Sequence, residues 1–147
     1  MAEIIVSYFV QHMRGDAYGQ RIWDNGQVEN YITRRPVKAS DGSYRSEAVT
    51  PGWYPIAQLS HVQLIALQQA ISYSNLPNLP EHIPPDPALK ENTGEKAQWQ
   101  VHGSAGLRTI TIDHWAPVGE VQGPLRWLVE RMGQIVITAQ SGSAAVP

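Results

Sequence analysis

The sequence contains no cysteine, so disulfides, thiolate metal ligands and cysteine nucleophiles are excluded. Charge is also scarce: charged residues make up 16% of the 147-residue chain, against about 25% in a typical soluble domain. Eleven Lys and Arg face thirteen Asp and Glu, which gives a net charge of −2. Because binding to a nucleic-acid backbone requires clustered positive charge, we expect no nucleic-acid partner.

Long apolar runs are missing as well. No stretch approaches the roughly 20 apolar residues that a membrane-spanning helix needs. The N-terminal segment carries Glu3 where a secretory signal peptide would carry basic residues. We therefore expect a cytoplasmic protein that makes no membrane contact.

Metal and cofactor motifs are absent from the sequence too. The five histidines are His12, His61, His82, His102 and His114. No two of them stand at the spacing that places metal ligands on one helix face, and there is no phosphate-binding loop or dinucleotide fingerprint. Asp113 and His114 are neighbours at a strand end, where successive side chains point in opposite directions. The expectation is no metal, no cofactor and no catalytic residue.

Strand signals are clear at three places in the chain. Apolar residues make up 42% of the sequence, enough for a core. Residues 3–12 are apolar on both faces, which is typical of a central strand. The pair Asn25-Gly26 predicts a tight hairpin that joins 18–24 to 27–35. A second hairpin, with a loop over 103–106, joins "AQWQVHG" to "LRTITID".

Two segments have the periodicity of amphipathic helices. Ser60 is a favoured N-cap, and Leu64, Leu67 and Ile71 after it fall on one stripe. The second helix is predicted to begin at Pro124, a residue suited to the first helical position. Its apolar stripe consists of Leu125, Leu128, Val129, Met132 and Val136.

These segments predict the order β-β-β-α-β-β-α and an α+β fold. Both helices need a sheet face to cover, so we expect one two-layer domain over 1–138, with about five mostly antiparallel strands and both helices on one face. Turn-forming residues predict long loops at 36–58 and 74–96. In the second loop, Leu76, Leu79 and Ile83 are expected to anchor a packed strap. Residues 139–147 are small and polar and predict a flexible tail.

Aromatic residues provide the candidate binding sites. There are five Trp but a single Phe. Trp127 falls about 140° from the centre of its helix's apolar stripe, so it is either an exposed interface anchor or covered by the 36–58 segment. Tyr44, Trp53 and Tyr54 lie in the 36–58 segment, where aromatic residues either shield the uncovered sheet face or recognise a partner. Shielding is favoured for Trp53, and recognition for Tyr44.

Exposed apolar residues also predict self-association. Val62 lies off its helix's stripe, as Trp127 does, and such patches on small proteins usually meet a partner. We expect a protein partner, either a second copy in a homodimer or another protein.

The succession of a hairpin, "LSHVQLIALQQAI", "NLPNLP", a Pro-Asp loop, "AQWQV", "TITID" and "PLRWLVERM" resembles the emfourin family. The likeness covers roughly residues 18 to 137. Emfourins are small cytosolic proteins, and some of them inhibit thermolysin-like metalloproteases. The resemblance implies a protease-inhibitor-like role for this chain, but it assigns no inhibitory residue.

Two classes of function therefore follow from the sequence. The first is a small non-enzymatic binding module, with an emfourin-like inhibitor as its sharpest form. The alternative is an enzyme whose site is built from separated residues, His114, Asp113 and Tyr54, around the 36–58 loop. A deep pocket lined by His114 would favour the enzyme, and a flat face that bears Trp53 or Trp127 would favour the module.

Overall fold

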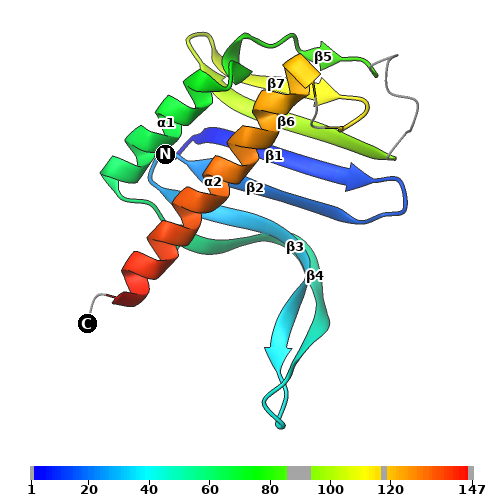
Figure 1. Ribbon diagram of the computed structural model, residues 1–147, viewed down its shortest axis with the longest axis vertical. Helices are drawn as coiled ribbons and strands as arrows, with labels where there is room; N and C mark the ends of the chain where they lie inside the picture. Colours follow the sequence, from blue (N-terminus) through cyan, green and yellow to red (C-terminus); the bar gives the residue numbers. More distant parts are fainter. Residues whose placement is uncertain (1, 86–93, 117–118, 146–147) are drawn as a thin grey trace.

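The computed structural model describes residues 2–85, 94–116 and 119–145. Within these ranges the chain forms one mixed seven-stranded sheet and two α-helices, which both lie in front of one face of the sheet (Figure 1). The strands are ordered β4-β3-β2-β1-β6-β7-β5 across the sheet. The elements are β1 (Ile4–His12), β2 (Ala17–Trp23), β3 (Gln27–Lys38), β4 (Tyr44–Gln58), α1 (His61–Tyr73), the 3₁₀ turn η1 (Leu76–Asn78), β5 (His82–Ile83), β6 (Glu95–Gly103), β7 (Gly106–Ile112) and α2 (Gly119–Ala145).

The α+β class predicted from the sequence is confirmed, but the predicted strand count and order are wrong. Two strands were missed, β4 and β5. The prolines Pro51 and Pro55 suggested a loop. However, β4 is an edge strand, and prolines are tolerated there because their nitrogens can face solvent instead of the neighbouring strand. β5 has two residues and pairs in parallel with β7, which makes the sheet mixed.

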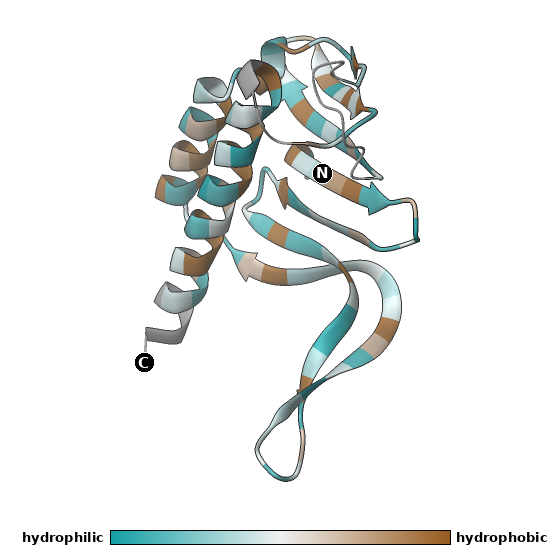
Figure 2. Cartoon of the chain, turned by 45° about the vertical axis from the view of Figure 1, so that its right-hand side comes forward, coloured by the Kyte–Doolittle hydropathy of each residue, from teal (hydrophilic) through white to brown (hydrophobic). Residues whose placement is uncertain are grey.

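The predicted irregular loop at 36–58 is therefore wrong. Its first residues end β3, and 44–58 form the whole of β4, so only residues 39–43 connect the two strands. Beyond a register irregularity between Ile32 and Arg34, this hairpin leaves the body of the sheet and extends away from it as an arm (Figures 1 and 2). We call residues 33–50 the arm.

Both predicted helices are present, with different bounds for the second. Ser60 caps α1 as expected, and its hydroxyl accepts from the N–H of Gln63, whose side chain returns a bond to the Ser60 N–H. α2 begins at Gly119, five residues before the predicted start at Pro124, and continues to Ala145. The predicted flexible tail from 139 is thus helical up to 145, and residues 146–147 lie outside the described part of the chain.

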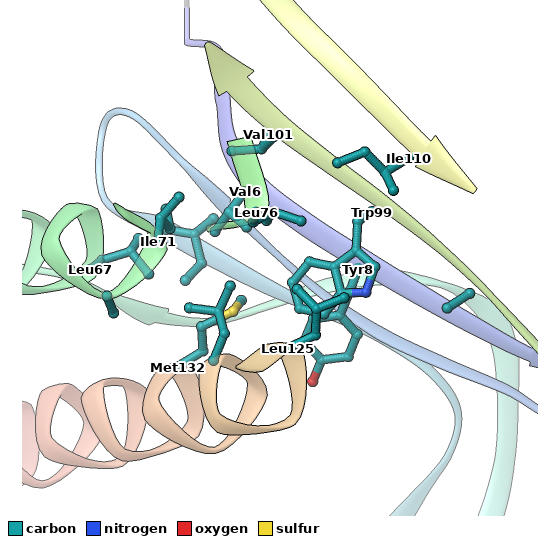
Figure 3. Close-up of a cluster of buried hydrophobic side chains, with 14 of the residues drawn as sticks. Val6, Tyr8, Leu67, Ile71, Leu76, Trp99, Val101, Ile110, Leu125 and Met132 are labelled. Atoms are coloured by element: carbon teal, nitrogen blue, oxygen red, sulfur yellow. The ribbon is translucent and has the colours of Figure 1, made fainter. Parts of the chain in front are cut away.

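The core lies between the helices and the sheet. Trp99 of β6 is fully buried there and its ring centroid is 5.1 Å from that of Tyr8 on β1 (Figure 3). Burial, with a smaller contribution from Tyr18, raises the pKa of the Tyr8 hydroxyl to about 12. Figure 3 shows Leu67 from α1 and Leu125 from α2 directed into this cluster.

The segment after α1 forms the expected packed strap as far as it is described. The predicted anchors Leu76, Leu79 and Ile83 are all buried. Arg108 of β7 donates hydrogen bonds to the carbonyls of Pro77 and Leu79 and so ties the strap to the sheet. The predicted loop at 74–96 therefore contains η1, β5 and the start of β6, and its residues 86–93 lie outside the described part.

No helix in the described residues is long and apolar enough to cross a membrane.

We expect the chain to unfold in a single cooperative transition, because one continuous cluster of buried side chains joins both helices to the sheet. Far-ultraviolet circular dichroism and tryptophan fluorescence should give the same midpoint in urea. Separate midpoints, or proteolysis between Asn75 and Pro85 that releases two folded halves, would contradict this expectation.

Candidate functional site

The sheet face that the helices leave uncovered carries a row of aligned residues. Phe9 on β1 pairs with Gly19 on β2, Gly19 pairs with Tyr31 on β3, and Tyr31 pairs with Trp53 on β4. On the other side of Phe9 the row continues to Gln98 on β6. Directly opposed residues in a sheet point to the same face. Three aromatic rings from three strands are thereby brought together.

Gly19 allows these rings to touch. It lies between Phe9 and Tyr31 but has no side chain, so their rings meet edge to face with centroids 4.9 Å apart. Tyr31 and Trp53 also meet edge to face, at 5.5 Å. A Cβ built on Gly19 would lie 3.1 Å from the Trp53 ring, which shows that the indole covers the glycine.

The neighbouring row supplies an arginine to this cluster. Ser7, Arg21, Glu29 and Pro55 are paired across the four strands β1 to β4. The Arg21 guanidinium carbon lies 4.5 Å from the centroid of Trp53, within the range of a cation–π contact. The Arg21 Nε also donates to the carboxylate of Glu29, 2.5 Å away.

Glu29 fixes the arginine in place. Besides Arg21, its carboxylate accepts hydrogen bonds from Trp23 Nε1, at 2.6 Å, and from the Gln27 side chain. Burial alone would raise the pKa of this carboxyl group. The hydrogen bonds and the positive charge of Arg21 outweigh that effect, and the pKa of Glu29 lies below its ordinary value. Glu29 is therefore ionised at neutral pH and holds the Arg21 guanidinium over the Trp53 indole.

We call Phe9, Tyr31, Trp53 and Arg21 the aromatic face. Together with Ser7, Gln98 and Gln100 these residues line an open hollow of about 280 Å³. Its chemistry combines π surfaces, a held guanidinium and amide groups. These groups can contact a partner through ring faces, a positive charge and amide hydrogen bonds.

A larger hollow of about 540 Å³ lies elsewhere, between α1 and the start of β1. Its floor is apolar and includes Ile5 and Leu64, but every polar residue that lines it is exposed. Its lining includes His102, whose Nδ1 lies 3.9 Å from the Glu3 carboxylate. Because these polar residues are all exposed, whereas Arg21 and Glu29 are held together in a partly buried position, we regard the aromatic face as the better candidate site.

The four residues predicted as binding sites lie in four different places. Trp53 is part of the aromatic face, whereas its neighbour Tyr54 points to the opposite side of β4, where its hydroxyl donates to the Thr50 carbonyl. Tyr44 lies on the arm and is 70% exposed. Trp127 is 38% exposed on the outer side of the helices and lies against Tyr73, with ring centroids 4.8 Å apart.

The structure does not bring the residues of the alternative enzyme site together. His114 is buried, and Asp113 pairs with the exposed His82 at 2.6 Å. Tyr54 lies on β4, five strand spacings from β7, which is roughly 24 Å at ~4.8 Å per spacing. Among the described residues no group of three or more His, Asp or Glu could hold a metal ion.

Five residues of the site were not predicted from the sequence: Phe9, Gly19, Arg21, Tyr31 and Glu29. Residues 3–12 were expected to be apolar on both faces, but nothing in the local sequence pattern indicated which residues the second face would meet. A cross-strand register was needed to find them, since the contacts join residues up to 44 positions apart, from Phe9 to Trp53.

Comparison with models of known protein families gives no match for this chain, and comparison with curated proteins likewise finds no relative.

Proposed function

We propose that this protein is a non-enzymatic protein-binding module whose aromatic face contacts the partner. The observation that carries the proposal is the ring cluster of Phe9, Tyr31 and Trp53 on the uncovered sheet face, with Arg21 held against the indole. Trp, Tyr and Arg are the residue types that dominate binding energy in protein interfaces.

Preorganisation supports the same proposal. Arg21 is held by Glu29, and each ring of the cluster packs against another, so little side-chain freedom remains to be lost on binding. Immobilising a free side chain at an interface costs about 0.5–1.5 kcal/mol. A face whose groups are already ordered avoids most of that cost, as a dedicated contact surface would.

The resemblance to emfourins gives the proposal its sharpest form, an inhibitor of a thermolysin-like metalloprotease. In that form the aromatic face would contact the protease surface. The uncovered face of a sheet is broad and open, which suits a folded protein partner better than a small molecule, because small ligands bind in concave pockets that enclose them.

A titration of the protein into a thermolysin-like protease tests the inhibitor form. We expect hydrolysis of a peptide substrate to fall with increasing concentration of the protein. Trp53→Ala should weaken the inhibition at least about tenfold, because a central tryptophan anchor is commonly worth more than 1.4 kcal/mol. Trp127→Ala is the matched control, since it removes the same side chain from the helical side of the molecule.

Equal losses in the two variants would contradict a role for the aromatic face. Unchanged hydrolysis at a large excess of the protein would remove the inhibitor form. The broader proposal is then tested by co-precipitation with the wild type and both variants, where it requires a partner that Trp53→Ala loses and Trp127→Ala retains. Thermal melts of both variants separate lost contacts from lost folding.

A further inference from the structure

The outer half of β4 is an open sheet edge. β4 is the terminal strand at one edge of the sheet. It pairs with β3 along one of its two edges, and its other edge faces away from the sheet. The alternation of the ladder can be worked out from two observations. The Ala39 N–H donates to the Ser43 carbonyl at 2.7 Å, and Pro36, which has no N–H, lies opposite Ser46. In an antiparallel pair, hydrogen-bonded and non-hydrogen-bonded residue pairs alternate.

It follows that Tyr44, Ser46 and Ala48 belong to non-hydrogen-bonded pairs with β3, so their N–H and C=O groups point away from it. No N–H of these three residues has a hydrogen-bond partner in the described part of the chain. The Ser46 carbonyl accepts one bond from Arg34, at 2.7 Å. A carbonyl has two lone pairs, so a second donor can still bind there.

The inner half of β4 is protected against strand addition, whereas the outer half is not. Pro51 and Pro55 lie on the inner half, and prolines on an edge strand block pairing with another chain. There the Ile56 carbonyl also accepts a hydrogen bond from Gln140 of α2. The stretch from Tyr44 to Thr50 contains no proline and lies on the exposed arm (Figure 2).

The sequence of this stretch suits pairing with itself. When two copies pair antiparallel about a two-fold axis normal to the sheet, opposed residues must lie on the same face, so their positions differ by an even number. An axis through Arg45 would oppose two arginines, and one through Glu47 would oppose two glutamates. Only the register between them, with the axis at Ser46, places Arg45 opposite Glu47 of the other copy.

The same register matches the backbone and the packing. It makes Ser46 face its own counterpart and Tyr44 face Ala48, and these are the residues whose N–H and C=O groups point outward. Arg45 and Glu47 then form the non-hydrogen-bonded pairs, in which opposed side chains approach most closely. The large Tyr44 side chain lies beside the small one of Ala48. Hydrogen bonding, charge and side-chain size thus select one register.

We propose that the protein forms a symmetric homodimer in which the outer halves of two β4 strands pair antiparallel about Ser46, so that the sheet continues from one copy into the next. This surface is more specific than the exposed helix residues Trp127 and Val62, because it presents unpaired backbone groups in a self-complementary register. Each arm carries four basic and two acidic side chains, so register, and not net charge, selects the second copy.

Cysteine cross-linking tests the register cleanly, because the wild-type chain contains no cysteine. Only a residue on the two-fold axis meets its own counterpart, at a Cα separation of about 5.5 Å, which fits a disulfide. Under mild oxidation Ser46→Cys should therefore form covalent dimers about tenfold faster than Arg45→Cys or Glu47→Cys. An equimolar mixture of Arg45→Cys and Glu47→Cys should cross-link faster than either variant alone.

Sedimentation equilibrium of the wild type completes the test, with a dimer as the expected species. Ala48→Pro should shift it to monomer without changing the far-ultraviolet circular dichroism spectrum of the folded protein, because the Ala48 N–H is not used within one chain. A monomeric wild type, or equal cross-linking rates for the three cysteine variants, would overturn the proposal. So would faster cross-linking of Arg45→Cys or Glu47→Cys than of Ser46→Cys, because each marks a different axis.

Discussion

Gly19→Ala should lower the free energy of unfolding by about 3 kcal/mol, more than most single substitutions outside the buried cluster. The new Cβ would lie 2.4 Å from the Tyr8 carbonyl oxygen and 3.1 Å from the Phe9 Cα. Both are backbone atoms of β1 in the middle of the sheet, so neither can move away without disturbing the ladder. Overpacking a well-packed site typically costs 1–3 kcal/mol.

The same substitution should also separate the rings of the aromatic face. The added methyl group would lie 3.1 Å from the Trp53 ring, which must tilt away from the sheet. Near-ultraviolet circular dichroism, which reports on the packing of aromatic side chains, should therefore change in the folded protein. Urea denaturation followed by far-ultraviolet circular dichroism measures the loss of stability.

Gly103→Ala is the matched control for this prediction. Gly103 also lies in a strand, but the nearest atoms to a Cβ there are 3.7 Å away, which is ordinary contact. Its free energy of unfolding should change by less than about 1 kcal/mol. Equal losses in free energy of unfolding at Gly19 and Gly103 would contradict this prediction. They would show that replacing any strand glycine has this effect, and that the close approach at Gly19 is not its cause.

Local signals in the sequence located the elements that depend on local chemistry. Ser60 begins α1 because a capping residue needs only its own helix. β4 was missed because Pro51, Gly52 and Pro55 break most strands, and only its position at the sheet edge makes them acceptable. The two residues of β5 have no pattern of their own and exist as a strand through pairing with β7.

The aromatic face could not be predicted because it depends on a register that differs by one residue from the expected one. With Asn25-Gly26 alone as the turn, Gly19 would lie opposite Ile32. In the structure the loop has three residues, 24–26, with only Gly26 at positive φ, and Gly19 lies opposite Tyr31. A shift of one residue moves every side chain to the other face.

The arm shows a different limit of prediction from the sequence. None of its strand residues is buried, so no buried apolar face distinguishes its strands from a loop. The hairpin is held together mainly by backbone pairing between β3 and β4. Side-chain contacts add to it, such as the hydrogen bond from Arg34 to the Ser46 hydroxyl. A two-stranded ribbon is marginal in water by itself, which is the physical reason to expect that another strand completes it.

Glu29→Gln should lower the free energy of unfolding by about 2 kcal/mol at pH 7, because it leaves the Arg21 guanidinium without its carboxylate in a half-buried position. The effect should depend on pH with a defined sign. The pKa of Glu29 is lowered in the folded protein, so its ionisation contributes stability above the unfolded pKa of about 4.3. That contribution is lost as the pH falls through the folded pKa.

The difference in stability between wild type and Glu29→Gln should therefore be constant from pH 7 to about pH 5 and shrink below it. Asp41, whose pKa is lowered by hydrogen bonds from Ser43, titrates alike in both proteins and cancels from the difference.

Glu130→Gln is the control, since it removes a carboxylate from the exposed pair with Arg126 and should change stability by less than about 0.5 kcal/mol. Urea denaturation at pH 7, 5 and 3.5 measures all three proteins. A difference that stayed constant down to pH 3.5 would mean that Glu29 does not hold Arg21 as an ion pair. Arg21 would then not be preorganised on the aromatic face.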